Sequence, residues 1–261
     1  RLQLNTAKTE VIWCTSALRQ HQIPATALMV GNDAVMPVRS VRDIGIYVDS
    51  DLSMQTHISR TVSGCFAMLR QIRSIRRSVT RPVLQSLVVS LVLTRLDYGC
   101  TTLTGLPNTQ LRRLRAVQHA AARLIFRARK YDHVTPLLQQ LHWLPVQQRI
   151  QFRLATLVFR CLHGTAPRYL ADQLHRVADV ESRRRLRSSA TPALIVPSTK
   201  RKTIGDRAFG VAAARVWNSL LQSDVVSSTS LPIFRQRLKT KLFIDSYGTN
   251  KRNAKPDTQR P

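Results

Sequence analysis

Acidic residues are scarce in this chain of 261 residues. Only 14 Asp and Glu side chains stand against 41 Lys and Arg, which gives a formal net charge of +27. Such an excess repels itself unless a polyanion neutralises it, so nucleic acid is the partner we expect. A basic surface that only keeps the chain soluble is one alternative. A basic amphipathic membrane binder is a weaker one, because the cations recur along the whole chain rather than on one helix.

Long hydrophobic runs are also missing. The most apolar stretch, residues 84–93, is interrupted by Gln85, Ser86 and Ser90, which is typical of a buried core helix rather than a membrane span. The polar N-terminus lacks the apolar region of a signal peptide. We therefore expect an intracellular protein with no membrane partner.

Motifs of enzyme chemistry are absent as well. The four cysteines form no Cys-x-x-Cys pair, so we expect free thiols in a reducing compartment and no zinc site. No G-x-S-x-G, P-loop or G-x-G-x-x-G motif occurs. Two-metal catalysis needs paired carboxylates, and the one close pair, Asp49 and Asp51, is better explained by a turn after a strand. We predict no metal site, no bound cofactor and no activity for the chain alone.

The hydrophobic pattern predicts an α+β fold that is mainly helical. Residues 1–52 are predicted to be β-rich, with a short strand at 10–15, a hairpin turn at Gly31-Asn32 and one alternating strand at 41–49. Residues 53–180 have helical periodicity, with Ser53 as the first N-cap. A helix at 81–94 is apolar nearly all round and should lie in the core. Pro136, Pro145 and Pro167 separate the later helices.

The C-terminal part is more basic and more broken. Residues 181–193 are predicted to form an exposed connector, and residues 194–209 a hairpin with Lys200, Arg201 and Lys202 at its tip. Helices follow at 210–221 and 230–243, the second with Ser230 as N-cap. We assign residues 181–247 to this basic C-terminal segment and residues 248–261 to a disordered tail.

Two sets of arginines lie on predicted helix faces. Arg70, Arg73 and Arg77 fall on one side near the end of the first helix, where the helix dipole also favours cations. In residues 108–130 the apolar face is Leu111, Leu114, Val117, Ala121, Leu124 and Ile125, and the opposite face carries Arg112, Arg115, His119, Arg123 and Arg127. A solvated face is the alternative, but such faces usually mix charge signs, and no acid occurs between Asp97 and Asp132.

These segments, in this order, resemble the C-terminal half of reverse transcriptases from non-LTR (LINE-type) retrotransposons of animals. "LQLNTAKTEVIW" resembles motif D, and "VRDIGIYVDSDLSMQTHISRTVSGCFAMLRQI" resembles the motif E strand and the start of the thumb. "TRLDYGCTTLTGLPNTQLRRLRAVQHAAARLIF", "DHVTPLLQQLHWLPVQQRIQFRL" and "LHGTAPRYL" resemble the thumb and post-thumb helices. "GDRAFGVAAARVWNSLL" and "FRQRLKTKLF" resemble the closing segment. The resemblance runs from Leu2 to Phe243.

The resemblance implies roles for several residues. Members of the family make DNA on an RNA template with Mg²⁺, which is expected only in the intact enzyme. Lys8, at the motif D position, would steady or protonate the departing pyrophosphate, unless it is simply a solvated lysine. The turn with Gly45, Asp49 and Asp51 would grip the primer. The arginine sets would follow the backbone of RNA, an RNA–DNA hybrid or a DNA duplex, in the nucleus or in a cytoplasmic ribonucleoprotein.

The chain also departs from the family. The fingers, motif A and the Tyr-x-Asp-Asp hairpin would lie upstream of Arg1, and in "RLDYGCTTL" the cysteine comes one residue later than in the usual Leu-Asp-Tyr-Cys. We expect a truncated reverse transcriptase, with the template–primer-binding side retained and the catalytic carboxylates missing. A non-enzymatic nucleic-acid-binding module and a transposon fossil without a function are the alternatives, and the sequence does not separate these two.

Overall fold

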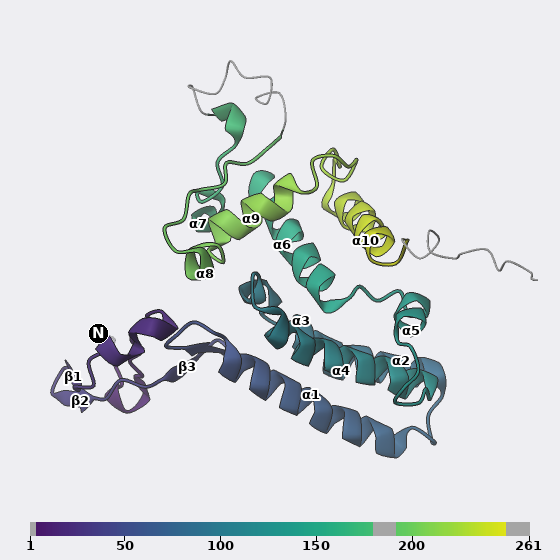
Figure 1. Cartoon of the computed structure of the whole chain (residues 1–261), viewed down its shortest axis with the longest axis horizontal. Helices are drawn as coiled ribbons and strands as arrows, with labels where there is room; N and C mark the ends of the chain where they lie inside the picture. Colours follow the sequence, from purple (N-terminus) through teal and green to yellow (C-terminus); the bar gives the residue numbers. More distant parts are fainter. Residues whose placement is uncertain (1–3, 180–191, 249–261) are drawn as a thin grey trace, which may run out of the picture.

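The computed structural model describes residues 4–179 and 192–248. Within them the fold is α+β and mainly helical, as predicted, with two small antiparallel hairpins in front of a long helical body (Figure 1). The predicted connector at 181–193 falls largely outside the described residues, and so does the predicted tail, apart from Gly248.

The first hairpin confirms the predicted Gly31-Asn32 turn. Strand β1 (Leu28–Val30) pairs with β2 (Asp33–Val35), and Gly31 takes a φ of +64°, as the first position of such a turn often does. Two short 3-10 helices, η1 (Thr6–Lys8) and η2 (Ala17–Gln22), precede it. The predicted strand at 10–15 is wrong, because only Val11 makes a single bridge, to Pro37.

The predicted strand at 41–49 is a second hairpin. Strand β3 (Ser40–Asp43) pairs with β4 (Ile46–Asp49) around a turn in which Ile44 and Gly45 both have positive φ, 42° and 83°. Tertiary contact explains the turn, because the Tyr98 hydroxyl donates to the Ile44 carbonyl oxygen. Gly45 suits this position because its φ of +83° favours glycine and because a Cβ there would lie only 3.2 Å from Cε1 of Tyr98.

Helix α1 (Gln55–Ile75) begins one residue later than predicted. Met54, in a left-handed conformation, is its N-cap in place of Ser53. A carboxylate supplies the missing acceptor at this helix end: the Thr56 N–H donates to Oδ2 of Asp49 at 3.0 Å. Asp49 and Asp51 thus hold the turn, since Oδ1 of Asp51 accepts from the Ser53 N–H at 2.9 Å.

The chain then returns along α1 and turns back. The returning segment consists of α2 (Arg81–Val88), the π-helical η3 (Val89–Leu93) and α3 (Thr94–Asp97). The short η4 (Cys100–Leu103) then leads into α4 (Asn108–Phe126), which runs beside α1 (Figure 1). Isoleucine, leucine and valine side chains from these helices form the first core, and every predicted apolar residue of α4 is buried. The helix predicted at 81–94 lies in the first core through Leu84, Val88, Val92 and Leu93, but Val83, Val89 and Leu91 on its other side are exposed.

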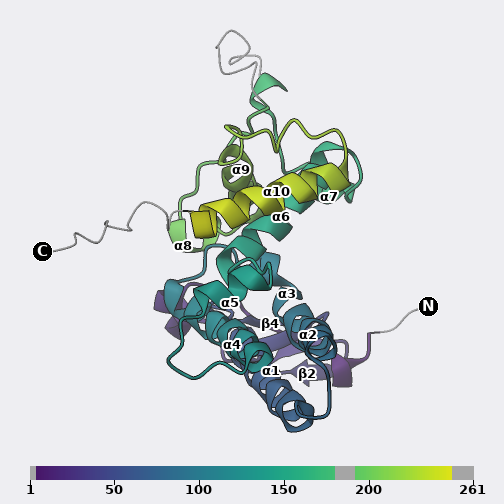
Figure 2. The same ribbon diagram turned by 90° about the vertical axis from the view of Figure 1, so that its right-hand side faces the viewer.

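A second core lies above the first. After α5 (Thr135–Gln140), the long helix α6 (Val146–Leu162) passes from one core to the other, with Ile150 in the first and Phe159 in the second (Figure 2). Helices α9 (Phe209–Asn218) and α10 (Leu231–Tyr247) pack on α6, and Ser230 is the N-cap of α10 as predicted. The short α7 (Arg168–Ala171), η5 (Val177–Asp179) and α8 (Lys202–Gly205) complete the described elements.

The predicted hairpin at 194–209 is not present. Leu194 forms an isolated bridge with Arg176, and Asn218 holds the Leu194 backbone from both sides, at 2.9 and 2.8 Å. The basic residues of the supposed tip lead into α8 instead. The Leu194 backbone therefore pairs with Arg176 and Asn218, and not with a neighbouring strand as a hairpin would require.

No helix among the described residues is long and apolar enough to cross a membrane.

Candidate nucleic-acid interface

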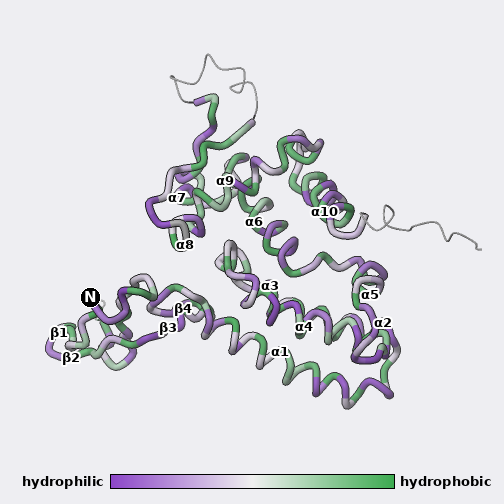
Figure 3. The backbone as a smooth tube through the Cα atoms, viewed as in Figure 1, coloured by the Kyte–Doolittle hydropathy of each residue, from purple (hydrophilic) through white to green (hydrophobic). Residues whose placement is uncertain are grey.

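The C-terminal halves of α1 and α4 enclose a groove of about 690 Å³, which we call the arginine groove. Figure 1 shows the two helices side by side, and Figure 3 shows that the tube becomes hydrophilic at the end of α1. The groove is lined by Phe66, Leu69, Arg70, Arg73, Arg76, Ala120, Arg123, Leu124, Ala128, Arg129 and Lys130.

The floor of the arginine groove is apolar. Phe66 and Leu69 come from α1, and Ala120 and Leu124 from α4. Leu69 and Leu124 are buried in the first core, while Phe66 and Ala120 are partly buried against it. The helical period puts these side chains between the two helices and leaves the cations at the rim.

The rim of the arginine groove is cationic. Six basic residues line it, and no carboxylate does. The nearest acid in sequence, Asp132, is engaged with the backbone, because its Oδ2 accepts from the Arg129 N–H. Unopposed guanidinium groups around a hydrophobic floor produce a positive potential suited to a polyanion.

Arg123 is a partly enclosed cation of the set. Its Nη2 donates to the Asp132 carbonyl oxygen at 3.2 Å, and its buried Nε has no hydrogen-bond partner. Its neighbour His119 is half-buried, and burial, together with the charges of Arg123 and Arg115, lowers the pKa of His119. His119 is therefore neutral at pH 7 and adds no charge to this face.

The structure brings together only part of the predicted arginine sets. Arg70, Arg73 and Arg123 share the arginine groove. Arg77 follows the end of α1, is exposed and does not line the groove. Arg112 and Arg115 lie on the N-terminal half of α4.

The continuous rail expected along α4 is interrupted at both ends. Arg115 donates to Oε1 of Gln147, on α6, at 3.1 Å. Arg127 is the C-cap of α4 in a left-handed conformation and lines a neighbouring cavity of about 300 Å³ together with Arg76 and Arg81. The basic face of α4, which helical periodicity predicted to be continuous, is therefore divided by contacts with other parts of the fold.

Three cations of the arginine groove were missed in the sequence. Arg76 is the C-cap of α1, and Arg129 and Lys130 follow the end of α4. The sequence does show basic residues at these helix ends, in the run Arg127-Ala-Arg129-Lys130 and the pair Arg76-Arg77. Helical periodicity, however, does not predict where a side chain beyond the end of a helix points.

The other predicted site residues lie on elements that precede the start of α1 (Figure 1). Lys8 ends η1 and is exposed. Gly45 is in the β3–β4 turn, and Asp49 and Asp51 hold the start of α1. A helix of 21 residues spans roughly 30 Å, so Lys8 and the arginine groove do not form one site.

The described residues contain no metal-binding cluster and no disulfide. No group of three or more His, Cys, Asp or Glu side chains is placed to hold a metal ion there. All four cysteines are free, and burial raises the pKa of the Cys65 and Cys100 thiols to about 11. These two thiols are therefore protonated at neutral pH.

Comparison with protein-family models, curated proteins and solved structures finds no match to this chain in any of the three.

Proposed function

We propose that the chain binds the phosphodiester backbone of nucleic acid in the arginine groove. The observation that carries the proposal is the convergence of six cations from two helices on one apolar-floored groove with no lining carboxylate. Phosphate oxygens are the acceptors that guanidinium groups pair with best, and contacts to the backbone carry no sequence preference.

The uncompensated charge of the arginine groove supports the same proposal. Positive charge that is not balanced within the protein is stabilised when counterions or phosphates approach it. The groove is thus most stable with an anion at its rim.

At a finer level, we propose that residues 4–52 and the first helical core correspond to the palm end and the thumb of a non-LTR reverse transcriptase. The ordered motifs from "LQLNTAKTEVIW" onwards support this assignment. Under this proposal the arginine groove holds the template–primer duplex and the β3–β4 turn lies on the primer side. Without paired carboxylates the chain alone makes no DNA, and a primer-extension assay with Mg²⁺ and nucleotides should give no templated product.

A non-enzymatic binding module is the second candidate. It is favoured by the two cores of the helical body, which take none of their buried apolar residues from residues 4–53. A body that is complete without the hairpins could bind nucleic acid independently of any polymerase. Both candidates use the same groove.

Salt titration of duplex binding tests the groove. Each phosphate contact contributes about 0.9 to the slope of log K against log salt. Arg70→Ala with Arg73→Ala should reduce that slope by up to about 2 and weaken binding to all sequences alike. The matched control removes two exposed arginines from the second half of the chain, Arg168→Ala with Arg235→Ala. Equal losses in the two variants would show that net charge, and not the groove, binds the duplex.

A further inference from the structure

A second pocket lies where the two cores meet, and we call it the junction pocket. It has a volume of about 420 Å³ and is enclosed by η3 and α3, by the loop before α6, by α6 itself and by α10. It shares no lining residue with the arginine groove.

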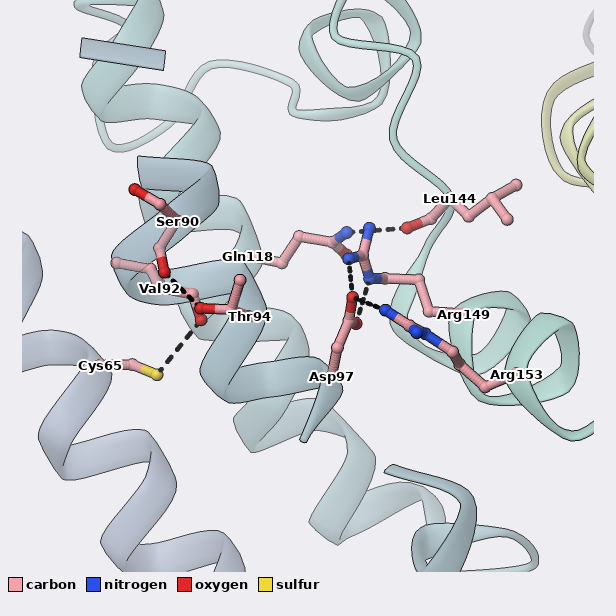
Figure 4. A network of polar contacts seen from close by, with 9 residues as sticks. All are labelled: Cys65, Ser90, Val92, Thr94, Asp97, Gln118, Leu144, Arg149 and Arg153. Atoms are coloured by element: carbon pink, nitrogen blue, oxygen red, sulfur yellow. Dashed lines mark hydrogen bonds and ion pairs between the residues drawn. The ribbon is translucent and has the colours of Figure 1, made fainter. Parts of the chain in front are cut away.

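One carboxylate organises the polar side of the junction pocket. The Oδ1 and Oδ2 atoms of Asp97 accept from Nε and Nη2 of Arg149 at 2.8 and 2.6 Å, and Oδ2 also accepts from Nη2 of Arg153 at 3.1 Å (Figure 4). Asp97 is mostly buried, so this bidentate pair satisfies both of its oxygens. The pair fixes α3 against α6.

The cations of the junction pocket exceed this carboxylate. Arg149, Arg153 and Lys239 line it with Asp97 as the single lining acid, which leaves a net charge of +2. Arg149 is taken up by its two bonds to Asp97, whereas the side chain of Arg153 is 47% exposed. Lys239 reaches the pocket from α10 and is exposed. Arg153, which donates one hydrogen bond to Asp97, and Lys239 are therefore the exposed cations of this pocket.

The rest of the lining of the junction pocket is largely apolar. Leu93, Trp143 and Phe152 are among the apolar side chains that line it. Pockets of this size that combine an apolar wall with a few convergent charged groups are typical of sites for small organic ligands. A bare inorganic anion would leave the apolar wall unused.

Two irregularities of the backbone occur at the same pocket. The π-helical segment η3 contributes Val89 and Leu93, and π segments within α-helices occur frequently at functional sites. His142, which lines the pocket, has a φ of +52°, which is uncommon for a residue other than glycine. Conformations of this kind persist where the surrounding structure holds them, most often at binding sites.

We propose that the junction pocket binds a mononucleotide, with the phosphate between Arg153 and Lys239 and the base against the apolar wall near Phe152. The ligand is either a free nucleotide or the phosphorylated end of a nucleic-acid strand, because both present the same chemistry. The proposal does not depend on the arginine groove, since the two sites share no residue.

Calorimetric titration of the full chain with adenosine 5′-monophosphate tests the proposal. Adenosine and inorganic phosphate, each lacking half of the recognised group, should bind at least about tenfold more weakly than the nucleotide. Arg153→Ala and Lys239→Ala should each weaken nucleotide binding about tenfold. Competition by a trinucleotide with a 5′-phosphate, but not by the same trinucleotide without it, would identify the strand end as the ligand; no competition by either would identify the free nucleotide.

Two controls make the outcome decisive. Arg160→Ala removes an exposed arginine from the same helix as Arg153, outside the pocket, and should leave nucleotide binding unchanged. If Arg153→Ala alters the thermal unfolding of the protein, Lys239→Ala alone decides, because Lys239 does not contact Asp97. The proposal is wrong if the nucleotide binds no more tightly than adenosine, or if Lys239→Ala and Arg160→Ala bind it equally well.

Discussion

Residues 4–53 and the helical body that follows are held together by different forces. In the hairpin region, all of which the structure describes, Asp49 alone is buried, and large apolar side chains such as Leu18, Met29 and Ile44 are exposed. The helical body has two cores joined by α6. Isolated two-stranded hairpins are marginal in water, so the hairpin region depends on hydrogen bonds to the body more than on a core of its own.

Most attachments between the two regions are polar, although Ile46 of β4 also packs against the first core. Asp49 accepts from the first turn of α1, and the Tyr98 hydroxyl donates to the β3–β4 turn. Arg207, between α8 and α9, donates to the Leu52 carbonyl oxygen at 2.5 Å, and burial lowers its pKa although Asp51 opposes the shift. Single substitutions can remove one of these attachments, or one side chain of either region, and so measure how much each contributes to stability.

A matched pair of tryptophan substitutions gives the largest expected contrast. Trp217 is 2% exposed and its indole N–H donates to the Pro192 carbonyl oxygen, whereas Trp13 is 40% exposed. Trp217→Ala should lower the free energy of unfolding by about 3–5 kcal/mol, and Trp13→Ala by less than about 1 kcal/mol. Denaturant unfolding followed by circular dichroism measures both. Equal losses would mean that the hairpin region carries a core after all.

Asp49→Ala tests the attachment itself, with an intermediate effect. The substitution removes an acceptor from the Thr56 N–H and from the Ser53 hydroxyl, which should cost about 1–2 kcal/mol in the same unfolding experiment. Asp51→Ala is the control, because Asp51 accepts one bond within the turn, and we expect it to cost about 0.5 kcal/mol. A smaller loss for Asp49→Ala than for Asp51→Ala would contradict this assignment.

Acidification should give the smallest effect. Burial lowers the pKa of His57 in α1, although Asp49 opposes the shift, and it lowers the pKa of His119 in α4. The unfolded chain therefore takes up protons first as the pH falls through about 6.5, and stability falls, by at most about 1.4 kcal/mol per pH unit for each histidine. His57→Gln should make this pH dependence shallower, and the exposed His133→Gln should not. Unfolding curves between pH 7.5 and 5.5 that keep the same slope in all three proteins would exclude the mechanism.

Features that depend on neighbouring residues alone could be predicted from the sequence. The apolar face of α4, with Leu111, Leu114 and Val117, follows from the period of 3.6 residues, and its residues are buried as predicted. The Gly31-Asn32 turn follows from glycine's tolerance of positive φ. By contrast, Ile44 gave no turn signal, since a β-branched residue rarely has positive φ. Its turn exists because Tyr98, 54 residues away, holds it.

For the candidate sites, too, some features follow from the sequence and others only from the tertiary structure. Charge and helical period alone determined that the chain is basic and that Arg70, Arg73 and Arg123 lie on outer faces of helices. Only the tertiary structure decided that these three share a groove with Arg76, Arg129 and Lys130, while Arg115 turns to α6 and Arg127 to another cavity. A sequence specifies which face a side chain occupies, because that depends on local geometry. Which faces meet depends on how whole helices pack, and that is set by cores whose members are far apart along the chain.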